Sequence, residues 1–186
     1  RKSKKRVPTR VKQPLVQPIG TNISWSMDFM SDSLASGRRF RTLNILDDFN
    51  REILHIEIAT GLPSPRVIRV LEELEEWRGL PRSIRVDNGP EFISHQLSEW
   101  CREKEIELQF IQPGKPMQNG YVERFNKTYR NEILDRFLFL ELDDVREITL
   151  EWMEDYNNHR PHDSLNDQTP MEYANNVKAL IMDNSS

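Results

Sequence analysis

The chain has 186 residues, of which 37% are hydrophobic and 30% charged, which is typical of one globular domain and excludes a fibrous or disordered protein. No apolar run approaches the roughly 20 residues that a membrane-spanning helix needs, so we expect no membrane partner and a cytoplasmic location. A single cysteine, Cys101, excludes an internal disulfide and a multi-cysteine zinc site. The net charge of −4 does not exclude nucleic acid, because the charge is unevenly distributed.

The N-terminal segment is basic and contains several prolines. Seven of the 26 Lys and Arg residues, and none of the 30 acidic residues, lie in residues 1–12. We predict that residues 1–20 form an extended arm, which either binds nucleic acid or serves as a solvated linker. Because the first residue is Arg1 and not Met, we also expect a further portion of the protein before it.

Three consecutive strands are predicted after the arm. Ile23–Met30 alternates between apolar and polar side chains, which places Asp28 on the face opposite Trp25. Phe40–Phe49 and Ile53–Thr60 follow, both rich in Ile, Leu and Phe. The short connection between these two strands predicts an antiparallel hairpin.

Helices and short strands alternate in the rest of the chain. The predicted segments are a helix from Ser64 to Gly79, a strand Ser83–Asp87, a helix Ser94–Lys104, a strand Ile106–Ile111, a loop Gln112–Gly120 and two helices, Tyr121–Phe137 and Asp143–Asn157. The order β-β-β-α-β-α-β-α-α predicts an α/β fold with a mixed five-stranded sheet and helices on its faces. The ribonuclease H-like architecture has this order.

Three acidic residues stand where α/β folds assemble active sites. Asp28 lies on the first strand, Asp87 ends a short strand before an Asn-Gly-Pro turn, and Glu123 lies in the first turn of a helix. Carboxylates are the ligands that Mg²⁺ prefers, and two such ions promote an in-line displacement at phosphorus. The scattered histidines do not predict a competing zinc site.

The helix that carries Glu123 also carries two cations on the same side. At 100° per residue, Glu123, Lys127 and Arg130 fall within about 60° of one another, while Val122, Phe125, Tyr129 and Ile133 form a separate apolar stripe. A carboxylate for metal beside cations for phosphate suits DNA chemistry. An ordinary amphipathic helix with an i, i+4 ion pair explains the same pattern.

Four motifs carry a resemblance to a known family. They are Trp25-Ser-Met-Asp-Phe29, Val86-Asp-Asn-Gly-Pro-Glu-Phe92, Gln118-Asn-Gly-Tyr-Val-Glu-Arg-Phe-Asn-Lys-Thr-Tyr-Arg130, and Tyr156-Asn-Asn-His-Arg-Pro-His-Asp-Ser-Leu165 with Thr169-Pro170. In this order they resemble the integrase-type catalytic core of bacterial insertion-sequence transposases, relatives of retroviral integrases. The 35 residues between Asp87 and Glu123 match the family's Asp-Asp-35-Glu spacing.

The resemblance implies an activity and a set of site residues. Asp28, Asp87 and Glu123 match the family's catalytic carboxylates, which hold two Mg²⁺ or Mn²⁺ ions. The residues expected to contact DNA are Lys127, Arg130, Asn119, Lys115 and Arg160. The expected partners are the element ends and target DNA, bound by a homo-oligomer, and a site-specific DNA-binding domain is expected upstream of Arg1.

The sequence thus predicts a ribonuclease H-like catalytic core over residues 21–175, followed by a C-terminal tail over residues 176–186. The predicted function is metal-dependent cleavage at element ends and strand transfer into target DNA. Two alternatives stay open: a nuclease of the same fold that does not join DNA, and a non-catalytic DNA-binding module derived from a transposase. The loop Gln112–Gly120 is expected to close over the DNA.

Several other residues have a simpler interpretation. We interpret Asp47 and Asp48 as turn formers at a hairpin and Glu91 as a surface charge. Gly89 is expected to permit either a positive φ or a close approach of phosphate to the backbone. His162 is expected to contact DNA or to cap the end of the last helix. Cys101 is expected in the core, and so are the four tryptophans, Trp25, Trp77, Trp100 and Trp152.

Overall fold

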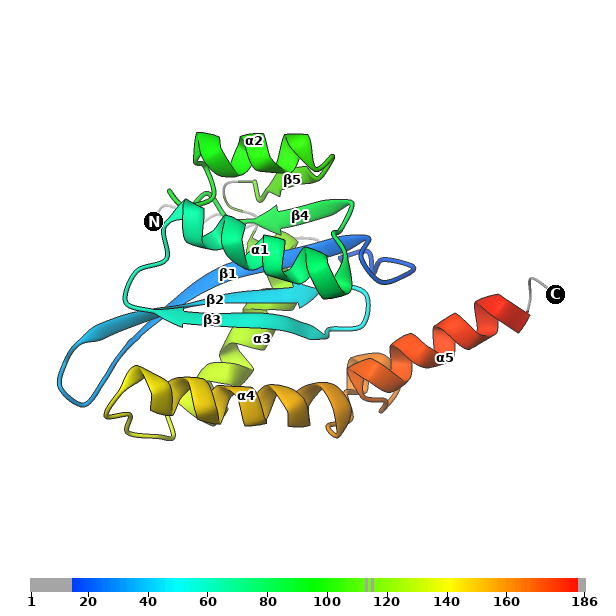
Figure 1. The fold of residues 1–186 in the computed structure, drawn as a ribbon. Helices are drawn as coiled ribbons and strands as arrows, with labels where there is room; N and C mark the ends of the chain where they lie inside the picture. The colour runs from blue at the N-terminus through cyan, green and yellow to red at the C-terminus, as the bar shows by residue number, and fades with distance from the viewer. Residues whose placement is uncertain (1–14, 113, 115, 184–186) are drawn as a thin grey trace, which may run out of the picture.

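A computed structural model of the chain describes residues 15–112, 114 and 116–183 (Figure 1). The strands are β1 (Ser24–Ser33), β2 (Arg39–Asp47), β3 (Ile53–Ala59), β4 (Ser83–Val86) and β5 (Glu107–Phe110). The α-helices are α1 (Ser64–Arg78), α2 (His95–Glu103), α3 (Gly120–Tyr129), α4 (Leu142–Asn158) and α5 (Pro170–Asp183). A π-helical turn, η2 (Arg130–Leu134), continues α3, and short 3₁₀ helices η1 (Pro116–Asn119) and η3 (Asp163–Leu165) complete the described elements.

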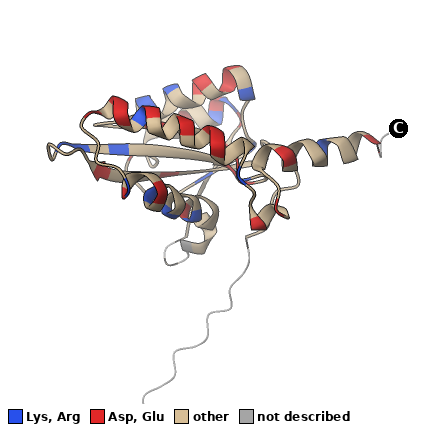
Figure 2. Ribbon diagram, turned by 90° about the horizontal axis from the view of Figure 1, so that it is seen from below, with Lys and Arg blue, Asp and Glu red and all other residues tan. Residues whose placement is uncertain are grey.

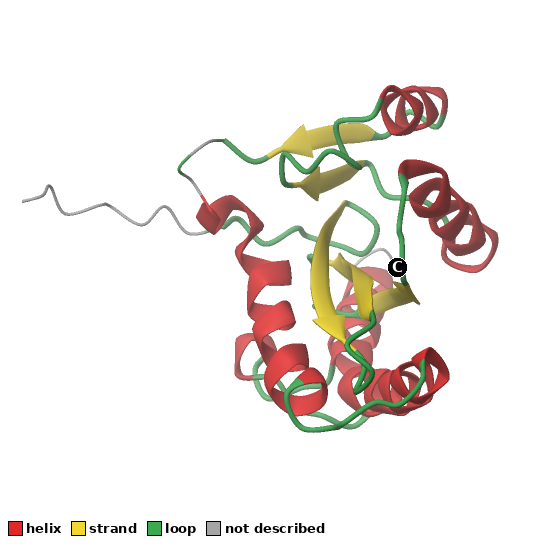
Figure 3. Cartoon of the chain, turned by 90° about the vertical axis from the view of Figure 1, so that its left-hand side faces the viewer, coloured by secondary structure: helices red, strands yellow, loops and turns green. Residues whose placement is uncertain are grey.

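The five strands form one mixed sheet in the order β3-β2-β1-β4-β5. β1 pairs antiparallel with β2, and β2 with β3, whereas β4 pairs parallel with both β1 and β5. Parallel neighbours require crossover connections, which α1 and α2 supply. The predicted mixed five-stranded sheet is confirmed, and Figure 3 shows helices on both of its sides.

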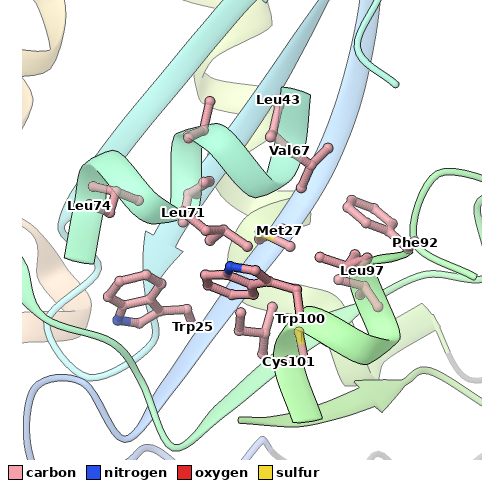
Figure 4. Packing of buried hydrophobic residues seen from close by; sticks show 14 of the residues in the cluster. Trp25, Met27, Leu43, Val67, Leu71, Leu74, Phe92, Leu97, Trp100 and Cys101 are labelled. Atoms are coloured by element: carbon pink, nitrogen blue, oxygen red, sulfur yellow. The ribbon is translucent and has the colours of Figure 1, made fainter. Parts of the chain in front are cut away.

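One face of the sheet packs against α1 and α2. Trp25 and Met27 of β1 are fully buried and belong to one cluster with Leu71 of α1 and with Trp100 and Cys101 of α2 (Figure 4). Each large apolar side chain buried in this way stabilises the fold by about 1.5–3 kcal/mol relative to its exposed state. The period-2 pattern of β1 therefore turns Asp28 toward the opposite face, as the sequence predicts.

The opposite face packs against α3, η2 and α4. The predicted apolar stripe is confirmed, since its four members are at most 4% exposed: Val122, Phe125, Tyr129 and Ile133. The prediction of one α-helix over Tyr121–Phe137 is wrong after Tyr129. There the helix widens into η2, closed by a hydrogen bond from the Asp135 amide to the Arg130 carbonyl at 2.8 Å. This wider turn buries both Ile133 and Leu134 against the core.

The predicted C-terminal tail, residues 176–186, begins within a helix, because α5 continues to Asp183. The helix begins with a reciprocal cap: the Thr169 amide donates to Glu172 Oε2 at 2.9 Å, and the Glu172 amide donates to Thr169 Oγ1 at 3.2 Å. Pro170 occupies the first turn, where a missing N–H costs nothing. The Thr-Pro-Met-Glu sequence therefore indicates the start of a helix. In Figure 1, α5 projects away from the rest of the fold.

Trp77 is 63% exposed, so its assignment to the core is wrong. The buried side of α1 is made by Val67, Val70, Leu71 and Leu74, and it is complete before the last turn, where Trp77 lies. Trp25 and Trp100 are buried as predicted, and Trp152 is partly buried in the second cluster. Within the described residues, the helices are too short or too polar to cross a membrane.

Candidate active site

Asp28 lies in the middle of β1 and is held by two hydrogen bonds. Its Oδ1 accepts from the Phe29 amide at 2.8 Å, and its Oδ2 accepts from Nδ2 of Asn126, on α3, at 2.7 Å. Oδ1 of Asn126 in turn accepts from Nδ2 of Asn44 at 2.6 Å, and Asn44 is the β2 residue paired with Asp28. Two buried amides therefore fix the Asp28 carboxylate against the helix that carries Glu123.

Sequence reasoning missed Asn126 and Asn44. Asn126 stands three residues after Glu123, on the side of α3 that faces the sheet, and it is 9% exposed. A polar residue inside an apolar helix face requires a partner, because an unpaired buried amide costs about 1–3 kcal/mol. That interruption of the apolar stripe was the available signal.

Asp87 follows β4, which lies beside β1 in the sheet. Oδ1 of Asp87 accepts from the Gly89 amide at 2.9 Å, so the turn after the strand holds the carboxylate. A Cβ atom at Gly89 would lie 2.9 Å from the same Oδ1, which leaves no room for a side chain. The φ of Gly89 is not positive, so that predicted alternative is wrong. The Asp87 carboxylate approaches the Gly89 backbone, and the approach of a phosphate stays a prediction.

Gly89→Ala is expected to displace the Asp87 carboxylate and to lower metal-dependent DNA cleavage by about 100-fold, since a misplacement of about 1 Å has that cost. Stability should change by less than about 1 kcal/mol, because the turn is at the surface and φ is not in the left-handed region. Cleavage rates and urea unfolding of the variant test this. Gly61→Ala is the matched control, since nothing lies within 4 Å of a Cβ there. Equal cleavage by both variants would contradict the role assigned to Gly89.

Glu123 lies in the first turn of α3 and is exposed. The pKa of Asp28 is raised from 3.8 to about 6, mainly by burial and also by the negative charges of Asp87 and Glu123, against the hydrogen bonds from the Phe29 amide and Asn126, which lower it. Burial also raises the pKa of Glu123. Asp87 and Glu123 therefore both lie close enough to Asp28 to act on it electrostatically, although the three predicted carboxylates come from a strand, a strand end and a helix.

None of the three carboxylates has a salt bridge to Lys or Arg within the described residues. The same part of the chain contains no three His, Cys, Asp or Glu side chains that are already close enough to hold one metal ion. The arrangement is therefore a group of mutually repelling acids without a cation between them. Such a group favours a divalent cation, which would offset the repulsion.

The residues expected to contact DNA have different surroundings. Lys127 is exposed, whereas Arg130 at the start of η2 donates to Asp32 Oδ2 at 3.1 Å. The predicted strip of Glu123, Lys127 and Arg130 is thus exposed at its first two members only. Arg160 forms an ion pair with Glu132.

A further expected DNA contact, Asn119, is poorly accessible to a ligand. Asn119 is 2% exposed, and its Oδ1 is buried without a hydrogen-bond partner among the described residues.

Lys115 lies outside the described residues. In the expected loop around it, residues Pro116–Asn119 form η1, and the Gln112 amide donates to Gln118 Oε1 at 2.7 Å. This part of the segment is therefore a short helix and not the loop that was predicted.

Glu91 is not the free surface charge that we predicted. It forms an ion pair with Arg41, and its side chain is 18% exposed. The Arg41 guanidinium lies 4.3 Å from the centre of the Phe29 ring, which stacks on Phe92 at 4.7 Å. This cluster joins β1 and β2 to the turn that follows Asp87, and it stabilises the rim of the site.

Asp47 and Asp48 are fully buried, so their interpretation as simple turn formers is incomplete. Asp47 does accept from the Phe49 amide at 3.0 Å, but it also pairs with Arg78 at 3.2 Å. Asp48 pairs with Arg85 at 3.1 Å and has no contact with the three carboxylates above. Both acids stabilise the end of the sheet where β2 turns into β3.

Comparison with known proteins identifies the family. Two family models, each described as an integrase core domain, match residues 20–116 and residues 104–170. The chain therefore belongs to the integrase core domain family.

Its curated relatives include proteins of bacterial insertion elements. The chain is 39% identical over 163 residues to the insertion element IS407 uncharacterized 31.7 kDa protein of Burkholderia multivorans. This alignment covers 88% of this chain and 59% of that protein. It is 38% identical over 185 residues to the insertion element IS476 uncharacterized 39.2 kDa protein of Xanthomonas euvesicatoria, with coverage of 100% and 53%. The chain thus spans little more than half the length of these relatives, and the resemblance to insertion-sequence proteins is confirmed.

Solved structures with the same fold include viral integrases. A chain of the simian T-cell lymphotropic virus intasome aligns with a TM-score of 0.74 at 19% identity, over 90% of this chain and 60% of that one. The HTLV-2 integrase catalytic core domain in complex with magnesium aligns with a TM-score of 0.63 at 20% identity, over 83% of this chain and 97% of that one. The predicted ribonuclease H-like fold is confirmed.

Proposed function

We propose that the chain is the catalytic core of a bacterial transposase, which cuts DNA at the ends of an insertion element and joins them to target DNA. The observation that carries this proposal is that Asp87 and Glu123 both act electrostatically on the buried Asp28, and that none of these three carboxylates has a salt bridge to Lys or Arg in the described part of the chain. Family membership and the relatives from insertion elements support it. The proposed place of action is the cytoplasm, on chromosomal or plasmid DNA.

The three carboxylates fit a pair of Mg²⁺ or Mn²⁺ ions, because their mutual repulsion and hard oxygen atoms favour such ions. When bound, two ions activate the attacking oxygen and stabilise the leaving oxygen of an in-line displacement at phosphorus. The magnesium named in the structure of HTLV-2 integrase supports the same choice.

The residues of the chain supply position and charge in this mechanism. Asn126 and the Phe29 amide fix the orientation of Asp28, and the Gly89 amide fixes that of Asp87. Glu123, in the first turn of α3, supplies the third carboxylate. No covalent intermediate with a side chain is needed, because water and then the 3′-hydroxyl are the nucleophiles of the two steps.

The test is an assay that scores cut and joined products from a labelled element-end duplex in Mg²⁺ or Mn²⁺. Glu123→Gln removes charge at nearly constant shape, so we expect a loss of about 1,000-fold or more in both products, which corresponds to several kcal/mol. Glu151→Gln on the exposed side of α4 is the matched control and should retain full activity. Full metal-dependent activity of Glu123→Gln would refute the assignment.

The same assay decides between the transposase and its two alternatives. Cut products without joined products would indicate a nuclease of this fold. DNA binding without either product would indicate a non-catalytic module. The exposed cation Lys127, one turn after Glu123, and the sequence motif around Arg160 favour the transposase.

We propose that Lys127 contacts a DNA phosphate, because it is exposed one helical turn after Glu123. Lys127→Ala should weaken DNA binding and reduce the slope of log K against log salt concentration by about 1. Lys104→Ala, on α2 at the other face of the sheet, should leave the slope unchanged. An unchanged slope for Lys127→Ala would show that this side chain makes no phosphate contact.

The partners follow from the same proposal. Cutting and joining two element ends requires that two active sites act on one DNA complex, so we propose a homo-oligomer on DNA. The printed descriptions of related viral structures as an intasome and as a dimeric form support this. Both basic and acidic residues are distributed over the helices in Figure 2, so the proposed DNA contact depends on local groups.

A further inference from the structure

Two amide side chains, Asn44 and Asn126, form a hydrogen-bonded chain that ends on the Asp28 carboxylate. The helix α3, which carries Asn126, crosses β1 and β2 on the face opposite α1 (Figure 1), and Asn44 and Asp28 are paired across those two strands. Nδ2 of Asn44 donates to Oδ1 of Asn126 at 2.6 Å, and Nδ2 of Asn126 donates to Oδ2 of Asp28 at 2.7 Å. We call Asn44 and Asn126 the amide relay.

The direction of the relay follows from the charge of Asp28. An ionised carboxylate only accepts hydrogen bonds, so the end of the Asn126 side chain that faces Asp28 has to be its NH₂ group. The oxygen of Asn126 then faces Asn44, which has to present its own NH₂ group. The oxygen of Asn44 is left outside the relay, and it is buried without a hydrogen-bond partner among the described residues.

Asn44 occupies a position at which an apolar side chain would be more stable. It is 0% exposed, its partner on β3 is Ile56, and Leu46 follows it on the same face of β2. Both of these neighbours belong to the apolar cluster under α3 and α4. A buried amide with an unpaired oxygen destabilises the fold relative to an apolar group of the same shape. A polar residue that is kept at such a cost indicates a role other than packing.

That role is the orientation of the Asn126 amide. Without a donor at position 44, the Asn126 amide has two unfavourable arrangements. Either its oxygen is buried without a partner, or the amide turns over and its oxygen faces the oxygen of the Asp28 carboxylate. In both arrangements the hydrogen bond that orders Asp28 is weaker than in the relay. Outer partners that orient a metal ligand typically contribute about 10–100-fold to metal affinity.

We propose that Asn44 is a positioning residue of the active site, which acts through Asn126 to hold Asp28 in the orientation that binds a divalent cation. Asn44 contacts neither the cation nor the DNA in this assignment, because Asn126 lies between it and Asp28. The inference rests on the proposed function, since the cation is the one that Asp28 would hold there.

The first test measures the dissociation constant of Mn²⁺ for the full chain, from the electron paramagnetic resonance signal of free Mn²⁺. Asn44→Leu keeps the approximate size of the side chain and removes the donor. We expect it to bind Mn²⁺ about tenfold more weakly than the wild type, at the lower end of the effect of an outer partner. Its urea midpoint should stay close to that of the wild type, because one unpaired buried oxygen replaces another. Equal Mn²⁺ affinity of Asn44→Leu and the wild type would overturn the proposal.

Thr42→Val is the matched control. Thr42 lies two residues before Asn44 on the same face of β2, is 0% exposed, and has a hydroxyl without a hydrogen-bond partner in the described part of the chain. The substitution therefore removes a buried polar group from the same core but not from the relay, and Mn²⁺ affinity should be unchanged. An equal loss in Thr42→Val and Asn44→Leu would show a general disturbance of the core and would overturn the role of Asn44.

A double-mutant cycle tests whether Asn44 acts through Asn126. Asn126→Leu alone should weaken Mn²⁺ binding by about 10–100-fold, because it removes the direct partner of Asp28. Adding Asn44→Leu to it should cause no further loss, since the relay is already broken. Losses that add in the double variant would show that Asn44 reaches the site by another route, and would overturn the relay.

A second measurement needs no metal. In EDTA, the side-chain amide signals of Asn126 are recorded by NMR in a chain labelled with ¹⁵N-asparagine; Asn44→Leu should shift them, and Thr42→Val should not. A chain that shows this shift but binds no Mn²⁺ would overturn the proposed cation site, and the transposase with it, while the relay stands. A chain that cuts and joins DNA but shows neither the shift nor the weaker Mn²⁺ binding in Asn44→Leu would overturn the role of Asn44 alone.

Discussion

Replacing Asp28 with asparagine is expected to abolish DNA cleavage and joining and, at the same time, to stabilise the metal-free protein. The loss of activity should be about 1,000-fold or more, because removal of one carboxylate costs several kcal/mol of transition-state stabilisation. The gain in stability has a separate cause, which is the unfavourable charge of Asp28 in the folded state. Burial and the charges of Asp87 and Glu123 raise its pKa from 3.8 to about 6.

The sign of the pH dependence follows from that pKa. Between about pH 4 and pH 6 the folded protein holds a proton on Asp28 that the unfolded chain has released, so its stability falls as pH rises through this window. Above about pH 6 the folded protein carries the full free-energy cost of the charged, buried Asp28. Asp28→Asn has no such charge, so its free energy of unfolding in EDTA at pH 8 should be about 1–3 kcal/mol larger than that of the wild type. Below pH 4 the two proteins should be equally stable within about 1 kcal/mol.

Urea unfolding at several pH values, with and without Mg²⁺, measures these effects. Mg²⁺ should stabilise the wild-type protein, because it binds the folded state, and should have little effect on Asp28→Asn. Asp143→Asn at an exposed position of α4 is the control and should show no change of either kind. A variant that is less stable than wild type at pH 8, or that still cuts DNA, would contradict the description of Asp28.

Replacing Asp48 with alanine is expected to destabilise the fold by about 3–5 kcal/mol, since it breaks a buried ion pair from one side. Oδ2 of Asp48 accepts from Arg85 at 3.1 Å and from the Ser24 hydroxyl at 3.0 Å, and its Oδ1 accepts from the Ser26 hydroxyl. The substitution leaves a guanidinium and two hydroxyls without their partner. A loss of this size is a large part of the about 5–15 kcal/mol that stabilise a typical domain.

The free energy of unfolding in urea tests this expectation. The control is Asp143→Ala, whose ion pair with Arg146 is exposed and should contribute about 0–1 kcal/mol. Similar small losses for both variants would show that Asp48 is only a turn former, as its position in the sequence suggested. Cleavage activity per folded molecule should be unchanged in Asp48→Ala, because Asp48 has no contact with Asp28, Asp87 or Glu123.

Much of this fold could be predicted from periodicity and from residues at element ends. The alternation in β1 placed Trp25 in the core and Asp28 on the opposite face, and the apolar stripe of α3 identified the side that packs on the sheet. These features depend on neighbours in the chain, so a sequence displays them directly. The carboxylates were found because each stands at a strand or helix position where side chains point out of the core.

The errors have a common physical origin in contacts between distant segments. Trp77 is exposed because the buried side of α1 ends before it, which depends on where the sheet ends. Asp48 became a buried ion-pair partner because Arg85, on β4 and 37 residues away in the chain, reaches it in the fold. The π turn η2 forms because Ile133 and Leu134 both find space in the core.

The sequence by itself determined the order of the five strands and of the α-helices as far as α4, the two faces of β1 and the apolar stripe of α3, and it predicted the three carboxylates. Only the tertiary structure decided how these carboxylates are oriented and charged. Asn126 reaches Asp28 across 98 residues of chain, and the raised pKa of Asp28 comes from burial and from two other acids on separate elements. Local patterns set local conformation, whereas desolvation and charge coupling depend on distances through space, which the fold alone sets.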